Sequence, residues 1–194
     1  LTLGNALQGV GRFAEAIAAF ESARTLEPQS VEIHNNIGNA WFSLGERRQA
    51  IDWYRKALAL KPDYGLVMNN LGVALQQEGR IDEAIIAYRT ARDHGADIDA
   101  GNNLGLALPV LGEFDQAIAE FRRAIALRPD YVAAWRNMLG VMLYAPDLKN
   151  DTLWAAHREF GVAMAARVTT QLPTWEGSRD PERKLRVGYV SSDF

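Results

Sequence analysis

The clearest hydrophobic pattern in the chain lies in Val31–Tyr64. Its apolar residues recur at spacings of three and four, first around Trp41 and again around Tyr54, on either side of a break at Gly45. Such spacing is typical of amphipathic helices, so the segment is predicted to form two helices joined by a short turn. The pattern returns along the chain with a period of 34 residues. We therefore predict repeats at 1–30, 31–64, 65–97 and 98–131, and a half-repeat at 132–144.

Several positions of this unit, counted from Val31, hold the same kind of residue in every repeat. Glycine occupies positions 8 and 15, alanine positions 20 and 27, and an aromatic residue position 24. The position-8 and position-24 residues are Gly4, Gly38, Gly72 and Gly105, and Phe20, Tyr54, Tyr88 and Phe121. This is the pattern of the tetratricopeptide repeat, in which each unit packs against its neighbours. The predicted fold is an all-α, right-handed tetratricopeptide-repeat superhelix over residues 1–144.

Small residues at fixed positions predict how the two helices of a unit meet. Glycine at position 8 and alanine at position 20 should let the helices approach closely, while larger side chains fill the remaining space. Pro109 lies inside a predicted helix of the fourth repeat. Because proline lacks a backbone N–H, we expect a kink or an early end of the helix there.

Residues 145–194 depart from the repeat. The segment 145–167 is predicted to be a closing helix, capped by Asn150 or Asp151. Residues 168–184 are rich in proline and polar residues, which is typical of a linker. The apolar, β-branched run in 185–194 predicts a short β-strand, the start of a truncated second domain. We therefore expect the chain to be a piece of a longer protein.

Asparagine recurs on the first helix of each repeat. An asparagine amide offers two donors and an acceptor but is a mediocre helix former, so its recurrence favours a binding role over mere tolerance on a polar face. We predict that the position-6 residues line the concave surface and bind the backbone of an extended peptide, with position 5 as a secondary set. Position 6 holds Asn36, Asn70, Asn103 and Asn137, and position 5 holds Asn35, Asn69 and Asn102.

The amino-acid composition excludes some classes of binding partner. The formal net charge of −3 and the absence of a basic block argue against nucleic acid. No run approaches the roughly 18 apolar residues of a membrane span, so no membrane partner is expected. The lack of cysteine agrees with a cytoplasmic location. The three histidines are too scattered to form a metal or catalytic set and are expected to be structural: His34, His94 and His157.

The end of the chain carries a family resemblance. Together with the asparagine-bearing repeats and the helical segment PDLKNDTLWAAHREFG, the sequence RDPERKLRVGYVSSDF at Arg179–Phe194 resembles the protein O-linked N-acetylglucosaminyltransferases (OGT/SPINDLY-like). The resemblance implies a repeat arm joined to a Rossmann-like glycosyltransferase domain, whose first strand would lie within 185–194. It also implies transfer of N-acetylglucosamine from UDP-GlcNAc to Ser or Thr of proteins, without a required metal.

The same resemblance assigns the asparagines to binding of the acceptor protein. The family's catalytic residues would follow Phe194, so the 194 residues alone are expected to hold no catalytic site and no cofactor. The alternative is a non-enzymatic adaptor that binds extended peptides. A chaperone-tail clamp is disfavoured because Asn35, Ala100 and Asn103 stand where that clamp requires Lys or Arg. A homodimer is compatible with either interpretation.

Overall fold

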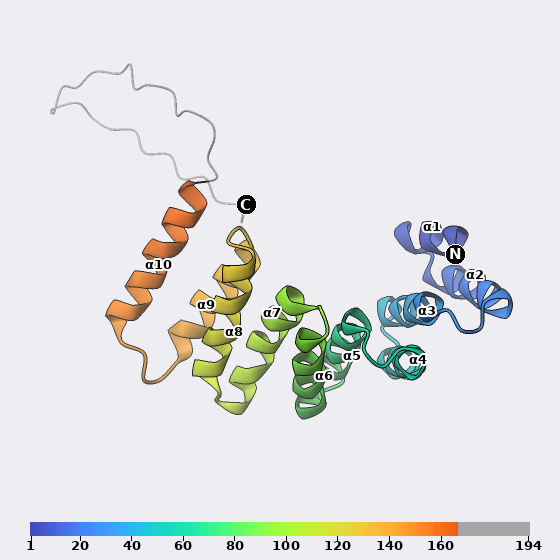
Figure 1. Cartoon of the computed structure of the whole chain (residues 1–194), viewed down its shortest axis with the longest axis horizontal. Coiled ribbons are helices and arrows are strands. Elements are labelled where there is room, and N and C mark those ends of the chain that lie inside the picture. Colours follow the sequence, from blue (N-terminus) through green and yellow to red (C-terminus); the bar gives the residue numbers. More distant parts are fainter. Residues whose placement is uncertain (167–194) are drawn as a thin grey trace, which may run out of the picture.

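The computed structural model describes residues 1–166 as helices joined by short turns (Figure 1). The linker predicted at 168–184 and the strand predicted within 185–194 lie outside the described residues. The elements are α1 (Thr2–Gly9), α2 (Phe13–Leu26), α3 (Val31–Ser43), α4 (Arg47–Leu60), α5 (Gly65–Gln77), α6 (Ile81–Asp93), α7 (Asp97–Ala107), the 3₁₀ helix η1 (Leu108–Leu111), α8 (Phe114–Leu127), α9 (Val132–Tyr144) and α10 (Asn150–Ala165).

The helices pair in chain order and the pairs stack into an arc. Helix α3 packs on α4, α5 on α6 and α7 on α8, and the second helix of each pair also packs on the first helix of the next. In Figure 1, α1, α3, α5 and α7 follow the inner edge of the arc, and α2, α4 and α6 follow the outer edge. The all-helical repeat fold is therefore confirmed for the described residues.

Close contact between a glycine and an aromatic ring holds each helix pair together. A Cβ atom added to Gly38 would lie 2.6 Å from Cε1 of Tyr54, and one added to Gly72 would lie 2.6 Å from Cε1 of Tyr88. Neither distance is compatible with a real carbon–carbon contact. Gly4 and Gly105 are equally close to the rings of their own repeats. This confirms that glycine at position 8 lets the two helices approach closely, and it shows that the ring of position 24 takes the space a Cβ atom would need.

The turn between the two helices of a repeat requires a left-handed backbone. Gly45 follows α3 with φ of +84°, and the other position-15 glycines, Gly11, Gly79 and Gly112, have φ between +77° and +82°. A side chain in this conformation is strained, which explains why position 15 is glycine throughout.

Pro109 ends its helix as the sequence predicts. Helix α7 stops at Ala107, and the chain continues as the short 3₁₀ helix η1. Without an N–H, Pro109 cannot continue the α-helical hydrogen-bond ladder. The change of helix type redirects Val110, whose side chain is 64% exposed.

The cap predicted for α10 is wrong. The residue before the helix is Lys149, which has extended backbone and no side-chain cap bond, and both Asn150 and Asp151 already lie within the helix. The carbonyl of Lys149 accepts from the backbone N–H of Thr152 and Leu153, so the first turn closes one residue earlier than a cap by Asn150 would require. Asp151 instead complements the positive end of the helix dipole.

Candidate peptide-binding surface

The asparagine-bearing helices line the inner side of the arc. Helices α3, α5, α7 and α9 carry positions 5 and 6 of their repeats. Successive members of this set contact one another more extensively than successive outer helices do in the described chain. Elements on the inside of a curved array lie closer together than those on the outside. The helices that carry the asparagines therefore lie on the crowded, concave side.

Hydrogen bonds join the position-6 asparagines to the preceding repeat. The side-chain nitrogen of Asn70 donates to the side-chain oxygen of Asn35 at 3.0 Å. Asn103 donates in the same way to Asn69, and Asn137 to Asn102, each at 3.0 Å. In the first repeat position 5 is Leu1, and Asn36 donates instead to Asn5 at position 9, at 3.2 Å. We call the asparagines joined by these bonds the amide ladder.

The two predicted sets of asparagines thus differ in what they do. The position-5 residues Asn35, Asn69 and Asn102 are buried, only 6–9% exposed, and their carbonyl oxygens are satisfied by the next repeat. The position-6 residues are partly exposed. The sequence places both sets side by side but does not reveal that position 6 of one repeat bonds to position 5 of the one before. The only signal is that the doublets recur one repeat apart.

Each rung retains capacity for a ligand. Within residues 1–166, the carbonyl oxygens of Asn70, Asn103 and Asn137 accept no hydrogen bond. Asn103 and Asn137 each also keep a second side-chain N–H, whereas Asn70 donates to both Asn35 and Asn39. A peptide backbone offers one donor and one acceptor per residue, the complement of such an amide. The ladder can therefore bind a main chain without breaking its own bonds.

Buried tyrosines hold polar side chains of the inner helices, and one of these side chains bonds to the ladder. The hydroxyl of Tyr54 donates to the side-chain oxygen of Asn39 at 2.8 Å, and that oxygen also accepts from Asn70 at 3.3 Å. The hydroxyl of Tyr88 donates to Gln76 at 2.8 Å. Burial raises the pKa of both phenols well above the ordinary value, so each remains a donor at neutral pH. The ring that packs on a position-8 glycine thus also fixes a polar side chain on the first helix of its repeat.

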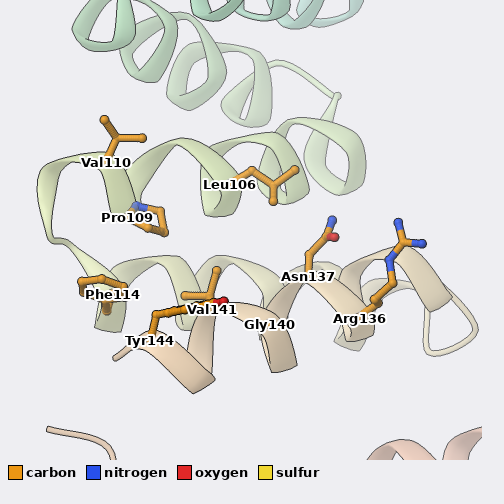
Figure 2. Close-up of a pocket in the computed structure, with 9 residues that line it drawn as sticks. All are labelled: Leu106, Pro109, Val110, Phe114, Arg136, Asn137, Gly140, Val141 and Tyr144. Atoms are coloured by element: carbon orange, nitrogen blue, oxygen red, sulfur yellow. The ribbon is translucent and has the colours of Figure 1, made fainter. Parts of the chain in front are cut away.

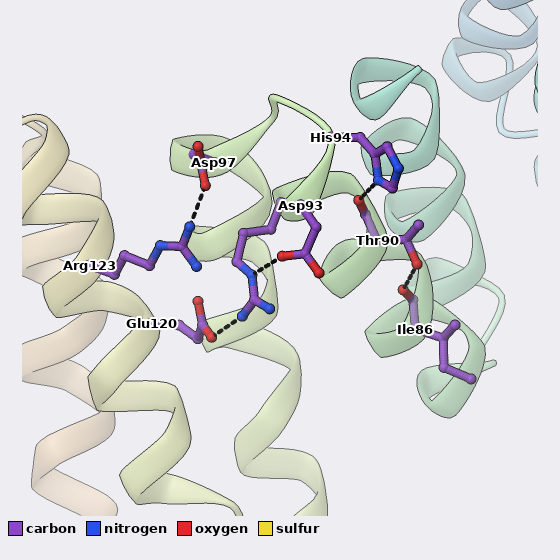
Figure 3. A network of polar contacts seen from close by, with 8 residues as sticks. Ile86, Thr90, Asp93, His94, Asp97, Glu120 and Arg123 are labelled. Carbon is purple, nitrogen blue, oxygen red and sulfur yellow. Dashed lines mark hydrogen bonds and ion pairs between the residues drawn. The ribbon is translucent and has the colours of Figure 1, made fainter. Parts of the chain in front are cut away.

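The histidines occupy structural positions. His34 is buried, with Nδ1 2.7 Å from the carbonyl oxygen of Ser30, and its ring lies 5.6 Å from that of Trp53. His94 lies at the end of α6, with Nδ1 2.8 Å from the carbonyl oxygen of Thr90 (Figure 3). His157 is exposed on α10, beside the ring of Trp154. These contacts are to a backbone carbonyl or an aromatic ring, and such contacts stabilise a helix or its packing.

Ion pairs connect α8 to the outer helix α6 and to the inner helix α7. Glu120 on α8 accepts from Arg92 on α6, and Arg123 on α8 pairs with Asp97 at the start of α7 at 2.6 Å (Figure 3). In residues 1–166, no three His, Cys, Asp or Glu side chains gather as a metal site requires. None of the helices described here is both long and apolar enough to cross a membrane.

Comparison with known families agrees with this architecture. Residues 1–65 and 102–145 match one family model of the tetratricopeptide repeat, and residues 67–91 match a second. The chain therefore belongs to the tetratricopeptide repeat family.

Sequence similarity to individual proteins covers only part of the chain. Over 70 residues the chain is 39% identical to the probable UDP-N-acetylglucosamine–peptide N-acetylglucosaminyltransferase SPINDLY of Petunia hybrida. Over 66 residues it is 38% identical to the protein of the same name in Arabidopsis thaliana. These matches cover 36% and 34% of this chain, and the chain spans only 7% of the length of either relative.

Solved structures share the fold. The chain resembles the crystal structure of MamA with a TM-score of 0.71 at 23% identity, over 85% of this chain and 94% of that one. It resembles YrrB, described as a tetratricopeptide-repeat protein with an unusual peptide-binding site, with a TM-score of 0.64 at 20% identity, over 86% and 89% of the two chains. At such identities the likeness is evidence of the fold alone.

Proposed function

We propose that this chain is a peptide-binding arm whose amide ladder holds the main chain of an extended polypeptide. The observation that carries the proposal is the ladder itself: amides from four successive inner helices, linked to one another, each with an unused acceptor or donor. A purely structural asparagine would have its polar atoms consumed by the fold. These retain some of theirs on the concave side.

The spacing of the rungs suits an extended ligand. Contacting helices lie about 8–10 Å apart, so successive rungs are separated by roughly the same distance. A polyproline II chain repeats every three residues and rises about 3.1 Å per residue, or about 9 Å per repeat. Such a chain presents the same edge to each rung. Four rungs then bind about nine residues, with little dependence on side chains.

The polypeptide that we propose as ligand is the acceptor of a glycosyltransferase. Two observations support this: the resemblance of Arg179–Phe194 to the start of a catalytic domain, and the local similarity to SPINDLY proteins. In this proposal the parent enzyme transfers N-acetylglucosamine from UDP-GlcNAc to Ser or Thr hydroxyls, and the described helices deliver the acceptor. The 194 residues by themselves bind without catalysing transfer.

Fluorescence anisotropy tests the binding step. A fluorescein-labelled Ser/Thr/Ala/Pro peptide of about nine extended residues is titrated with the 194-residue chain. The variant Asn70→Ala/Asn103→Ala should bind at least about tenfold more weakly, because it loses two adjacent rungs. The matched control is Asn150→Ala, which removes the same amide from α10, away from the ladder. Equal affinity of the ladder variant and the wild type, with helicity retained in both, would contradict the proposal.

The role as an acceptor arm is tested in the parent polypeptide. Incubation with UDP-GlcNAc and an unfolded Ser/Thr-rich acceptor protein should yield N-acetylhexosamine adducts detectable by intact-mass spectrometry. The ladder variant should slow modification of the protein while the donor still binds. If the parent polypeptide transfers no sugar to any hydroxyl, the chain is the adaptor of the alternative interpretation.

A further inference from the structure

An apolar pocket lies at the end of the amide ladder. It has a volume of about 510 Å³ and runs between α7–η1 and α9 (Figure 2). Leu106, Pro109 and Val110 form one wall, and Val141 and Tyr144 belong to the other.

Two departures from the repeat pattern create this pocket. The early end of α7 at Ala107 turns the chain into η1 and places Pro109 and Val110 at the rim. Gly140 occupies position 9, where earlier repeats carry Asn39 and Val73. A Cβ atom added to Gly140 would meet nothing within 4 Å. The pocket therefore includes the space that a side chain at position 140 would occupy, and no other described residue fills that space.

The pocket exposes apolar surface on the side where the ligand is proposed to lie. Leu106, Val110 and Tyr144 are 41%, 64% and 79% exposed. Grouped apolar exposure of this kind marks a binding surface more often than single exposed residues do. Covering it with an apolar side chain is favourable in proportion to the area removed from water.

The last rung of the ladder is part of the pocket wall. Asn137 donates to Asn102 and also lines the pocket, so a chain lying on the ladder passes over the opening. In Figure 2, Asn137 and Arg136 rise from α9 at one end of the groove, and Phe114 and Tyr144 lie at the other. The pocket is thus continuous with the amide ladder.

Arg136 places a positive charge at the end of the amide ladder, next to the pocket. It occupies position 5, where the second, third and fourth repeats hold a buried asparagine that accepts from the next rung. An arginine has no acceptor, so the ladder cannot continue past Asn137. Among the described residues Arg136 forms no ion pair, and its exposed guanidinium borders the apolar groove. An arginine in this setting complements a carboxylate.

We propose that this pocket binds one apolar side chain of a peptide held on the amide ladder, with a carboxylate of the same peptide next to it at Arg136. The inference rests on the proposed function and adds specificity to it. The ladder binds any extended main chain, and the pocket selects where along that chain it binds, favouring a Leu, Met or Phe beside an Asp or Glu.

Labelled peptides of about nine residues test this selection. The host is Ser/Thr/Ala, with either Leu or Ala at the centre and Asp or Asn beside it, in both orders. Wild-type chain should bind the Leu peptide about tenfold more tightly than the Ala peptide. It should also bind Asp more tightly than Asn in one of the two orders.

A variant whose side chain fills the pocket tests whether the pocket causes the preference for Leu. Gly140→Leu places a side chain in the open space and should abolish the preference for the Leu peptide over the Ala peptide. Gly161→Leu is the matched control, because Gly161 is also helical with nothing within 4 Å and lies on α10, outside the pocket. Arg136→Glu should abolish the preference for Asp over Asn beside the Leu.

The outcomes separate the two proposals. If the Ala peptide binds through the ladder but Leu adds no affinity, or if Gly140→Leu keeps the preference for Leu, the pocket proposal is overturned and the ladder stands. If Asp and Asn peptides bind alike in both orders, the carboxylate part is overturned. If no peptide binds the wild-type chain, the proposed function and this inference are both overturned.

Discussion

Adding one methyl group to Gly72 should destabilise the array, although the same change at Gly140 should stabilise it. The Cβ atom of Gly72→Ala would lie 2.6 Å from Cε1, 2.7 Å from Cδ1 and 3.1 Å from Cζ of Tyr88. Carbon atoms in contact normally lie about 3.5–4.0 Å apart, so the buried ring must move by close to an ångström. Overpacking of this kind costs about 1–3 kcal/mol.

Helix propensity acts in the opposite direction. Replacing a helical glycine by alanine favours the helix by about 1 kcal/mol. The net loss of unfolding free energy for Gly72→Ala is therefore about 0–2 kcal/mol, the difference of the two effects. At Gly140 an added Cβ meets nothing within 4 Å, so no overpacking opposes the gain in helix propensity. Gly140→Ala should therefore raise the unfolding free energy by about 1 kcal/mol.

Urea unfolding followed by circular dichroism measures both variants against the wild type. Because repeat arrays can depart from two-state unfolding, the comparison uses midpoints together with the slopes of the transitions. Combining Gly72→Ala with Tyr88→Leu provides an internal check, because a smaller, flexible side chain relieves the overlap and the two losses should be less than additive. If Gly72→Ala were as stable as Gly140→Ala, the proposed packing of glycine against the ring would be refuted.

Three further predictions concern the ladder, the tyrosines and the turn. In a double-mutant cycle, Asn69→Ala and Asn103→Ala should show a coupling of about 0.5–1.5 kcal/mol in unfolding free energy, and zero coupling would mean that their hydrogen bond is absent in solution. Tyr54 and Tyr88 have pKa values raised by burial, so the unfolded chain loses their protons first. The contribution of these two groups to stability should be constant below pH about 10 and fall above it, so unfolding midpoints at alkaline pH should decline less steeply in the double Phe variant. Gly45→Ala, at φ of +84°, should cost about 1–2 kcal/mol by the same assay, and an unchanged midpoint would argue against the left-handed turn.

Features determined within one repeat could be predicted from the sequence. The 34-residue period predicts the all-helical repeat fold, the small residues at positions 8 and 20 predict the close approach of the two helices of a unit, and Pro109 predicts the end of α7. Each depends on contacts within a single helix pair. The cap of α10 was not predictable from composition, because several polar residues compete at that start and the backbone carbonyl of Lys149 closes the turn.

Features that depend on how successive repeats meet could not be predicted. The sequence predicts the two asparagine positions as binding residues but does not reveal that Asn103 bonds to the buried Asn69 one repeat earlier. That pairing requires the relative placement of α5 and α7, which no local pattern gives. The pocket beside Asn137 likewise arises from Pro109 and Gly140, residues of different repeats whose effects combine only in three dimensions.

The side-chain amide resonances of the ladder report directly on whether an extended peptide binds to its asparagines. In ¹⁵N–¹H correlation spectra of the 194-residue chain, the NH₂ signals of Asn70, Asn103 and Asn137 should shift together and saturably as an extended Ser/Thr/Ala/Pro peptide is added. The NH₂ signal of Asn150, on α10, should not move. Saturable peptide binding that leaves the three ladder signals in place would show that the peptide lies elsewhere and would contradict the account.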